Sequence, residues 1–326
     1  MKKIAIVGVG GRTGTMFAFE LKNSADVLGI GRKKEVKLIK EKKLYIERKG
    51  EEPKVFEVKV IEDIEFKKEE KPDIIFLTTK NPVSSPIKFY YQKIKEKLPS
   101  LLISQNGIAA LEDSKKALKE TFDNEAEKVR IVRIALFNPI DRRGRDDRVY
   151  VKYSLPIRIA LSKGSGPEDI KDIVEIFKDA GFELTEVPEK EAKNLEFSKL
   201  FLNLIGMASA SQGLSIKEGF KRKDVFIEEI KSLREYKKVV EVAGGKFLNF
   251  PHYPVKSLAT FFSLVPLSVL FLFRNVLAKL ITKGREGKRK DLDEIEFYNG
   301  AVVKLGEKLN VETPINKKII KRVLKI

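Results

Sequence analysis

The sequence contains no cysteine and no tryptophan, and His252 is its only histidine. The lack of cysteine excludes disulfides, thiolate metal sites and cysteine nucleophiles. One histidine argues against a histidine-based metal site and against a catalytic triad, so we interpret His252 as a structural residue. We therefore expect no metal ion. The chemistry must come from lysine, carboxylate, amide or hydroxyl side chains, or from a bound cofactor.

Acidic residues are also in deficit, since 47 Asp and Glu stand against 65 Lys and Arg, a net charge of +18. Such a charge attracts nucleic acid, anionic membranes or small anionic substrates. The basic residues are scattered, with short runs such as residues 288–290 and no repeat of basic and aromatic residues. A lysine- and glutamate-rich surface, as in thermophiles, is the simplest source of the charge, and nucleic acid is the weaker alternative.

Long hydrophobic runs are missing as well. The most apolar stretch, residues 258–273, contains Pro266 and ends before Arg274. It falls short of the roughly 20 residues that cross a bilayer. A buried or dimer-facing helical hairpin is the favoured interpretation, and peripheral membrane contact is the alternative. Because a strand-like segment begins at Ile4, we expect no signal peptide and a cytoplasmic protein.

The length of 326 residues suits two domains. In the first half, strand and helix patterns alternate, which predicts an open parallel sheet with helices on both faces. The strands are expected at 4–7, 27–30, 74–79, 101–104 and 129–137, and helices at 13–22 and 86–98. Residues 44–48 and 55–60 resemble a hairpin, and residues 149–153 and 157–161 a second antiparallel pair that closes the sheet.

Beyond residue 190 only helical patterns remain, at 195–209, 225–243, 258–281, 292–309 and 316–324. The expected fold class is therefore α/β, with a Rossmann-type parallel sheet followed by an all-helical domain. We place a nucleotide-binding domain at residues 1–165 and a helical domain for catalysis and dimerisation at 166–326. The segment K-G-S-G-P at 163–167 is the expected linker.

A glycine-rich turn, I-V-G-V-G-G-R-T-G-T at residues 6–15, follows the first strand. Such a turn lets the backbone approach the pyrophosphate of a dinucleotide at the N-terminus of the next helix. Two registers fit. G-x-G-x-x-G uses Gly8 and Gly10 with Thr13 in the third place, whereas G-x-x-G-x-x-G uses Gly8, Gly11 and Gly14.

The end of the second expected strand reads G-I-G-R-K-K, with Arg32 as its first basic residue. A basic side chain here accepts the 2′-phosphate of NADP, whereas an acid would bind the ribose of NAD. Arg32 lies near the expected distance of roughly 20 residues from the turn. We therefore predict NADP(H) and favour the first register, with Thr13 helping to hold the phosphate and Gly14 relieving helix packing. The second register points to short-chain reductases, but their Tyr-x-x-x-Lys pair would be Tyr91 and Lys95, too early in the chain.

Four further segments carry polar groups that could do chemistry. Thr78-Thr79-Lys80 and Gln105-Asn106-Gly107 each follow an apolar strand. In the apolar segment F-S-K-L-F-L-N-L-I-G, Lys199 and Asn203 share one helix face. A partly desolvated lysine has a lowered pKa and can act as a general acid, although a lysine that extends to the surface is the alternative. Glu294, in D-E-I-E-F-Y-N-G-A-V-V, is a candidate acid or a solvated helix start.

Taken in order, G-V-G-G-R-T-G, L-T-T-K, Q-N-G-I, S-K-L-F-L-N, D-E-I-E-F-Y-N-G-A-V-V and E-T-P-I-N give the chain a resemblance to the ketopantoate reductase (2-dehydropantoate 2-reductase) family, in its longer-chain branch. The resemblance implies NADPH-dependent reduction of a 2-oxo acid between the two domains, in pantothenate and coenzyme A synthesis. The apolar stretch 258–273 suggests a dimer surface, so we expect a homodimer.

The same resemblance assigns roles to residues. Lys199 would donate a proton to the alkoxide that forms on the 2-oxo carbon, and Glu294 would orient the substrate. Asn106 and Asn203 would position substrate and nicotinamide. The residues expected to bind the cofactor are Gly8, Val9, Gly10, Gly11, Arg12, Thr13, Arg32, Lys80 and Asn106, and those expected to bind substrate are Asn106, Lys199, Asn203 and Glu294.

Two positions depart from the family pattern. Met207 stands where the family often has a second asparagine, and residues 283–290 contain no serine to bind the substrate carboxylate. Thr282 or a basic side chain could take over that contact. A reductase of another 2-oxo acid and a non-catalytic NADP-binding protein therefore remain as alternatives.

Overall fold

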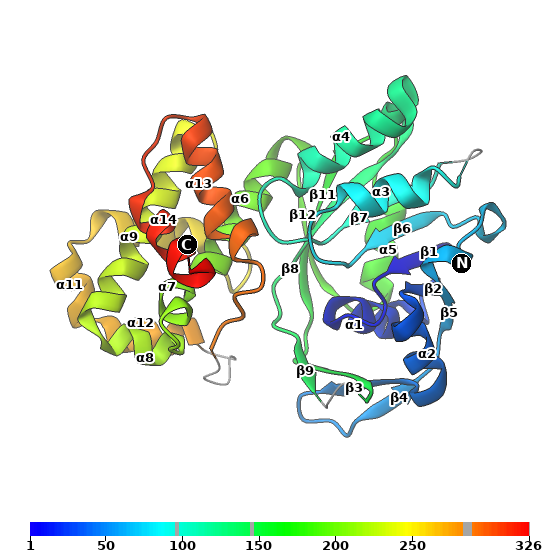
Figure 1. Cartoon of the computed structure of the whole chain (residues 1–326), viewed down its shortest axis with the longest axis horizontal. Coiled ribbons are helices and arrows are strands. Elements are labelled where there is room, and N and C mark those ends of the chain that lie inside the picture. The colour runs from blue at the N-terminus through cyan, green and yellow to red at the C-terminus, as the bar shows by residue number, and fades with distance from the viewer. Residues whose placement is uncertain (95–97, 144–146, 283–288, 326) are drawn as a thin grey trace. The chain divides into compact units, whose positions relative to one another are not determined.

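The computed structural model describes residues 1–94, 98–143, 147–282 and 289–325. Two compact units divide the chain: Met1–Gln105 with Ala110–Ala192, and Asn106–Ala109 with Lys193–Ile326. Figure 1 shows an α/β first unit and a helical second unit. The expected fold class, a Rossmann-type sheet followed by a helical domain, is confirmed.

An eight-stranded sheet, counted over the described residues, forms the centre of the first unit in the order β12-β11-β8-β7-β6-β1-β2-β5. Neighbouring strands run parallel except β11, which is antiparallel to β8. From β5 to β8 this is the strand order of a dinucleotide-binding fold. The strands are β1 (Lys3–Val7), β2 (Asp26–Gly31), β5 (Lys59–Glu62), β6 (Ile74–Leu77), β7 (Ser100–Ile103), β8 (Ile131–Leu136), β11 (Arg158–Ser165) and β12 (Glu183–Val187).

Helices cover both faces of this sheet, so its central strands are apolar on both sides. Ile4 and Ile6 of β1 belong to one buried cluster, with residues of α1 (Arg12–Leu21), α2 (Lys33–Lys42) and α5 (Lys171–Asp179). Ala5 and Val7 point to the opposite face and belong to a second cluster, with α3 (Ser84–Tyr91) and α4 (Ala110–Phe122). This explains the uninterrupted apolar runs from which the strands were predicted.

A smaller sheet in the order β4-β3-β10-β9 lies in the same unit. Its strands are β3 (Leu44–Arg48), β4 (Lys54–Phe56), β9 (Asp141–Arg143) and β10 (Val149–Tyr153). The hairpin of β3 and β4 is confirmed, although β5 joins the main sheet instead. The predicted pairing of 149–153 with 157–161 is wrong. Burial alternates along β10, as in a strand with one packed face, whereas residues 159–162 of β11 are all buried and fit only the main sheet.

The division between the units lies at Ala192 and Lys193, later than the predicted boundary at 165 and 166. The segment 163–167 is not a linker between domains, because the chain continues through α5 into β12. That strand pairs in parallel with β11 and extends the main sheet. The alternating strand–helix pattern therefore includes one more repeat than the sequence indicated.

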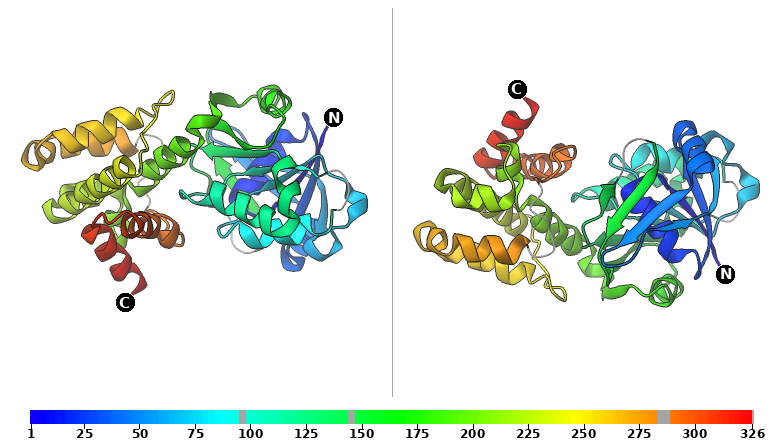
Figure 2. Two further views of the ribbon diagram at one scale, coloured as in Figure 1. Left: turned by 90° about the horizontal axis from the view of Figure 1, so that it is seen from above. Right: turned by 90° about the horizontal axis from the view of Figure 1, so that it is seen from below.

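The helical unit is arranged around its longest described helix, α9 (Lys223–Val242). Helices α10 and α11 flank α9 on one side and α13 and α14 on the other (Figure 2). The remaining helices of this unit are α6 (Ala192–Leu204), α7 (Met207–Ser211), α8 (Ile216–Lys221), α10 (Val255–Leu264), α11 (Leu267–Leu272), α12 (Arg274–Thr282), α13 (Asn299–Lys308) and α14 (Pro314–Leu324).

The apolar stretch 258–273 is buried within one chain only in part, at Ala259, Phe262 and Leu270. Burial within one chain therefore accounts for only part of the stretch, and the dimer-facing alternative stays a prediction. Helices α10 to α12 expose large apolar side chains, with Leu264 77%, Leu272 74% and Leu280 65% accessible. Phe261, Val269, Phe273 and Val276 are also exposed. Among the described residues, no helix combines the length and the apolar character needed to cross a membrane.

Candidate active site

The glycine turn joins β1 to α1, and it leaves no room for a side chain at its ends. Gly8 has a φ of +87°. A Cβ on Gly14 would lie 2.2 Å from the carbonyl oxygen of Gly8, whereas one on Gly10 would meet nothing closer than 3.4 Å. The structure therefore assigns close helix packing to Gly14, as expected. The register Gly8, Gly11, Gly14 describes the turn better than the favoured one with Thr13 third.

Backbone hydrogen bonds hold the turn in one shape. The N–H groups of Gly8 and Val9 donate to the carbonyl oxygen of Ile30 at 2.8 and 3.2 Å, and Gly11 N donates to Gly8 at 2.9 Å. The Val9 side chain is fully buried, so only its backbone can face a ligand. The predicted residues 8–13 thus form one ordered loop that ends in the first turn of α1, as required for binding a pyrophosphate.

The carboxyl ends of β6 and β7 contain two buried oxygen atoms that accept no hydrogen bond from the described part of the chain: Thr79 Oγ1 and Gln105 Oε1. The Gln105 amide nitrogen donates to the Thr79 carbonyl at 3.0 Å, so the two residues are adjacent. Because β6 lies beside β1, they lie at the point where the strand order reverses. Unpaired buried oxygens are costly, and a bound nicotinamide cofactor with N–H and O–H donors fits them. Lys80, predicted at this edge, is exposed.

Arg32 lies at the end of β2, where its side chain is 80% accessible. Its guanidinium donates to Glu35 at 2.6 Å, and its backbone N–H donates to the same carboxylate at 3.2 Å. The hydrogen bond to Glu35, followed by the charge of Glu35, raises the pKa of Arg32. The basic residue is thus where the sequence predicts it, but it is paired with an acid three positions further along the chain, Glu35.

Three of the predicted catalytic and substrate residues meet in the second unit. Asn203 Nδ2 donates to Asn106 Oδ1 at 2.9 Å across 97 positions of the sequence. Asn106 Nδ2 donates in turn to Glu294 Oε2 at 3.2 Å across 188 positions. Tyr298 OH donates to the same Glu294 oxygen at 3.1 Å. We call Asn106, Asn203, Glu294 and Tyr298 the amide–carboxylate cluster.

Lys199 lies on α6, one turn before Asn203, and both therefore share a face of that helix. Its neighbours Phe197, Leu200 and Phe201 are fully buried, while Lys199 itself is half-buried. The half-buried position agrees with a partly desolvated lysine beside the amide–carboxylate cluster. Gly8–Thr13, Arg32 and Lys80 all belong to the first unit.

Comparison with known proteins relates part of the chain to a known family. Residues 4–132 match the family model described as ketopantoate reductase PanE/ApbA. The match runs from β1 into β8, within the α/β part of the chain. No curated protein matches the chain.

Solved structures share the fold of this chain over nearly its whole length. A PanE/ApbA family ketopantoate reductase from Ralstonia eutropha JMP134 is 16% identical, with a TM-score of 0.76 and coverage of 99% of this chain and 97% of that one. D-mandelate dehydrogenase with NADH and anilino(oxo)acetate is 19% identical, with a TM-score of 0.74 and the same coverage. Dimeric ketopantoate reductase from Staphylococcus aureus is 16% identical, with a TM-score of 0.65, covering 99% and 98%.

Residues 283–288 of the loop without serine lie outside the described residues. The described end of that loop, Lys290, donates to the carbonyl oxygens of Asn203 and Ile205 at the end of α6.

Buried polar residues hold this part of the fold together. The sequence predicted no role for them. Asn316, in the segment E-T-P-I-N, is fully buried and accepts from Ser232 at 2.9 Å and from Asn299 at 2.8 Å. Its own amide donates to Glu235 at 2.7 Å. Asn316, at the end of this motif, therefore joins α9, α13 and α14. In the sequence, only the asparagine shortly after Pro314 pointed to this role.

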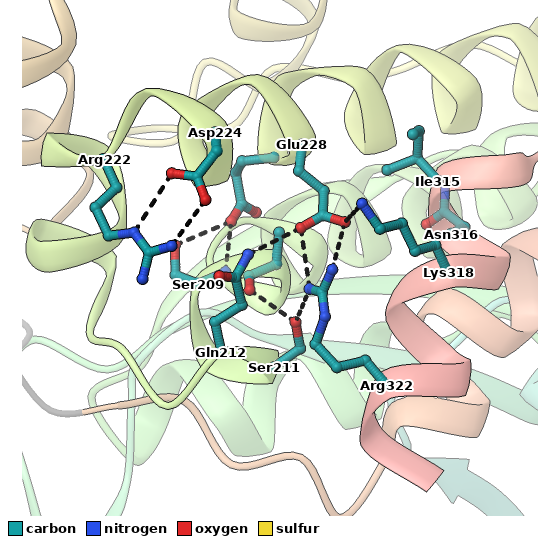
Figure 3. A network of polar contacts seen from close by, with 12 residues as sticks. Ser209, Ser211, Gln212, Arg222, Asp224, Glu228, Ile315, Asn316, Lys318 and Arg322 are labelled. Atoms are coloured by element: carbon teal, nitrogen blue, oxygen red, sulfur yellow. Dashed lines mark hydrogen bonds and ion pairs between the residues drawn. The ribbon is translucent and has the colours of Figure 1, made fainter. Parts of the chain in front are cut away.

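A second polar network ties α7 and α14 to α9 (Figure 3). Arg322 donates to both oxygens of Glu228 at 2.8 and 2.9 Å and to Ser211 at 2.7 Å. Lys318 lies 3.3 Å from Glu228. These contacts tie the C-terminal end of α7 to α9 and α14.

Two other residues singled out from the sequence play no part in this site. His252 is exposed in a turn with a φ of +65°, and the described residues contain no group of His, Asp or Glu side chains that could hold a metal ion. Tyr91 is fully buried and donates to the carbonyl of Pro99 at 2.9 Å. Its proposed partner in the short-chain reductase interpretation, Lys95, lies outside the described residues.

Proposed function

We propose that this chain is an NADPH-dependent reductase that converts 2-dehydropantoate to pantoate, a step of pantothenate and coenzyme A synthesis. The observation that carries the proposal is the amide–carboxylate cluster beside the Lys199 helix. Three distant segments bring two amides and a carboxylate together there, next to a half-buried lysine. A 2-oxo acid offers a carbonyl oxygen and a carboxylate to such donors.

In the proposed reaction, each side chain has a distinct task. The cofactor, when bound, supplies the hydride. The Lys199 ammonium donates a proton to the 2-oxo oxygen as negative charge develops on it, an interaction strongest in the transition state. Asn203 and Asn106 donate hydrogen bonds that orient the substrate, and Glu294 fixes the amide of Asn106. Such proton transfer contributes about 10²- to 10⁴-fold to a rate.

The first unit supports the cofactor half of the proposal. We assign the pyrophosphate to the loop of Gly8, Val9, Gly10 and Gly11 with Arg12 and Thr13, and the 2′-phosphate to Arg32. Lys80 and Asn106 complete the proposed cofactor contacts. The unpaired Thr79 and Gln105 oxygens support a ligand at this edge of the sheet.

We propose that the chain forms a homodimer through the apolar face of α10 to α12, defined by Phe261, Leu264, Val269, Leu272, Phe273, Val276 and Leu280. An exposed apolar face of this kind marks an interaction site. A homodimer also agrees with the dimeric Staphylococcus aureus enzyme of the same fold. The cytoplasmic location rests on the sequence expectation alone.

A substrate panel tests the proposed reaction. Oxidation of NADPH would be followed with 2-dehydropantoate, with phenylglyoxylate (the 2-oxo acid related to mandelate) and with short aliphatic 2-oxo acids. We expect the highest kcat/KM with 2-dehydropantoate. A higher value with another 2-oxo acid would assign that substrate instead, and turnover with none of them would contradict a reductase of this class.

A further inference from the structure

The end of β2 contains a charge pair that bears on which cofactor the chain accepts. Glu35 extends back from the first turn of α2 and receives both the guanidinium and the backbone N–H of Arg32, at 2.6 and 3.2 Å. Glu35 is the more covered partner, with 31% of its side chain accessible against 80% for Arg32. Arg32 therefore extends toward solvent while the Glu35 carboxylate lies close to the backbone.

Glu35 also lies directly against the glycine turn. A Cβ on Gly10 would meet Glu35 Cβ at 3.4 Å, and one on Gly31 would meet Glu35 Oε2 at 3.5 Å. The Glu35 side chain thus lies beside the loop that would bind pyrophosphate, and its carboxylate lies beside the last residue of β2. In dinucleotide folds, the hydroxyls of the adenosine ribose lie at this position.

A ribose 2′-hydroxyl and a 2′-phosphate would meet this pair differently. A carboxylate accepts hydrogen bonds from ribose hydroxyls, so Glu35 favours a cofactor without the phosphate. A phosphate is repelled by the carboxylate and must draw Arg32 away from it. An exposed ion pair contributes little free energy, so the competition weakens binding of the phosphate without preventing it. Asp63 adds a second negative charge that acts on Arg32.

We infer that Glu35 determines the cofactor selectivity of this chain, by holding Arg32 and offering a ribose acceptor, so that NADH is bound as well as NADPH. This inference rests on the proposed function, because it concerns the same cofactor site. It adds a residue that lowers the preference for NADPH and predicts a protein of relaxed selectivity. Arg32 raises the ratio of the NADH dissociation constant to the NADPH dissociation constant, and Glu35 lowers it.

The test is a pair of equilibrium titrations, with NADPH and with NADH, monitored by nucleotide fluorescence and without substrate. For the wild-type chain both nucleotides bind. In Glu35→Gln, loss of the competing charge and of the ribose acceptor raises the ratio Kd(NADH)/Kd(NADPH) about tenfold. In Arg32→Ala the same ratio falls about tenfold. The two variants thus test the inference even if one of them folds poorly.

Glu41→Gln is the matched control, because it removes the same charge from the same helix. Glu41 pairs with Lys37 at 3.9 Å on α2, and we expect its substitution to leave the ratio unchanged. An unchanged or lowered ratio in Glu35→Gln, or an equal shift in Glu41→Gln, would overturn the inference while leaving the proposed function intact. Binding of neither nucleotide by the wild-type chain would overturn both.

Discussion

At the scale of single residues, the glycine turn shows what a motif can and cannot predict. A strand followed by glycines and a basic strand end predicted a dinucleotide site, and the strand order from β5 to β8 agrees with that prediction. The favoured register of the glycine motif, in contrast, describes the turn less well than the other register. Steric exclusion falls on Gly14, whose Cβ would overlap the Gly8 carbonyl at 2.2 Å, and this depends on how closely α1 crosses β1. The spacing of glycines in the sequence does not reveal how closely α1 approaches the Gly8 carbonyl.

Gly14→Ala tests this assignment. The added methyl group must push α1 away from β1, so we expect a loss of about 1–3 kcal/mol in the free energy of unfolding. NADPH affinity should fall with it, because the loop and the start of α1 move together. Gly10→Ala is the control, since its Cβ has ordinary contacts, and its free energy of unfolding should match the wild type in urea titrations. If both variants lost the same free energy of unfolding, Gly14 would have no special role in packing α1 against β1, and the assignment would be contradicted.

The amide–carboxylate cluster marks the limit of sequence reasoning at this scale. Each of Asn106, Asn203 and Glu294 was predicted, but only the family resemblance connected them. Nothing in the composition of three segments up to 188 positions apart indicates that they hydrogen-bond. Tyr298 completes the cluster and lies in the same motif as Glu294, but the sequence predicted no role for it.

At the scale of elements, helices were predicted well and their ends poorly. The helical pattern of residues 195–209 is interrupted at Gly206, which has a φ of +95°, and that of 258–281 at Pro266. Apolar periodicity continues through both breaks, because all the fragments pack against the same core. The extra repeat of α5 and β12 was overlooked since β12 is mostly partly exposed and charged.

A buried carboxyl group lies at the break between α6 and α7. Glu229, on α9, accepts from the N–H groups of Gly206 at 2.6 Å and Ser209 at 3.2 Å. Burial raises its pKa to about 7, against the opposing effect of these hydrogen bonds and of Lys290. A carboxyl whose pKa is raised on folding stabilises the fold below its unfolded value of 4.5, and that contribution is lost as the pH rises toward 7.

We therefore expect the free energy of unfolding to contain a contribution from Glu229 that falls as the pH rises from 4.5 to about 7. Urea titrations at pH 5 and pH 8 measure it. Glu229→Gln lacks the titrating group, so its loss of stability between the two pH values should be smaller than that of the wild type. Only this difference is diagnostic, because glutamine also removes one acceptor. Identical pH dependence in both proteins would contradict the raised pKa.

At the scale of the whole molecule, the apolar face of α10 to α12 bears on two expectations for the stretch 258–273. The stretch was expected to be buried or to face a dimer partner, and within one chain it is buried only at Ala259, Phe262 and Leu270. The sequence could not distinguish these outcomes, because both place apolar residues on helices that do not span a membrane. A second copy of the chain is the proposed cover.

Light scattering after size-exclusion chromatography tests the dimer. The wild type should have twice the mass of the chain, and the double variant Leu264→Lys, Leu272→Lys should have the mass of one chain, since it places charges on the apolar face. Val55→Lys, at an exposed apolar position of the first unit, should remain dimeric. A monomeric wild type, or one that binds lipid vesicles through this face, would contradict the proposal.

The central claim is that Lys199 donates a proton to the 2-oxo oxygen of the substrate when the cofactor transfers its hydride. Lys199→Ala tests it most directly, through the rate of a single turnover of 2-dehydropantoate with saturating NADPH, next to the NADPH dissociation constant. The account predicts a rate lower by about 10²- to 10⁴-fold and an unchanged dissociation constant. A rate close to that of the wild type would contradict it.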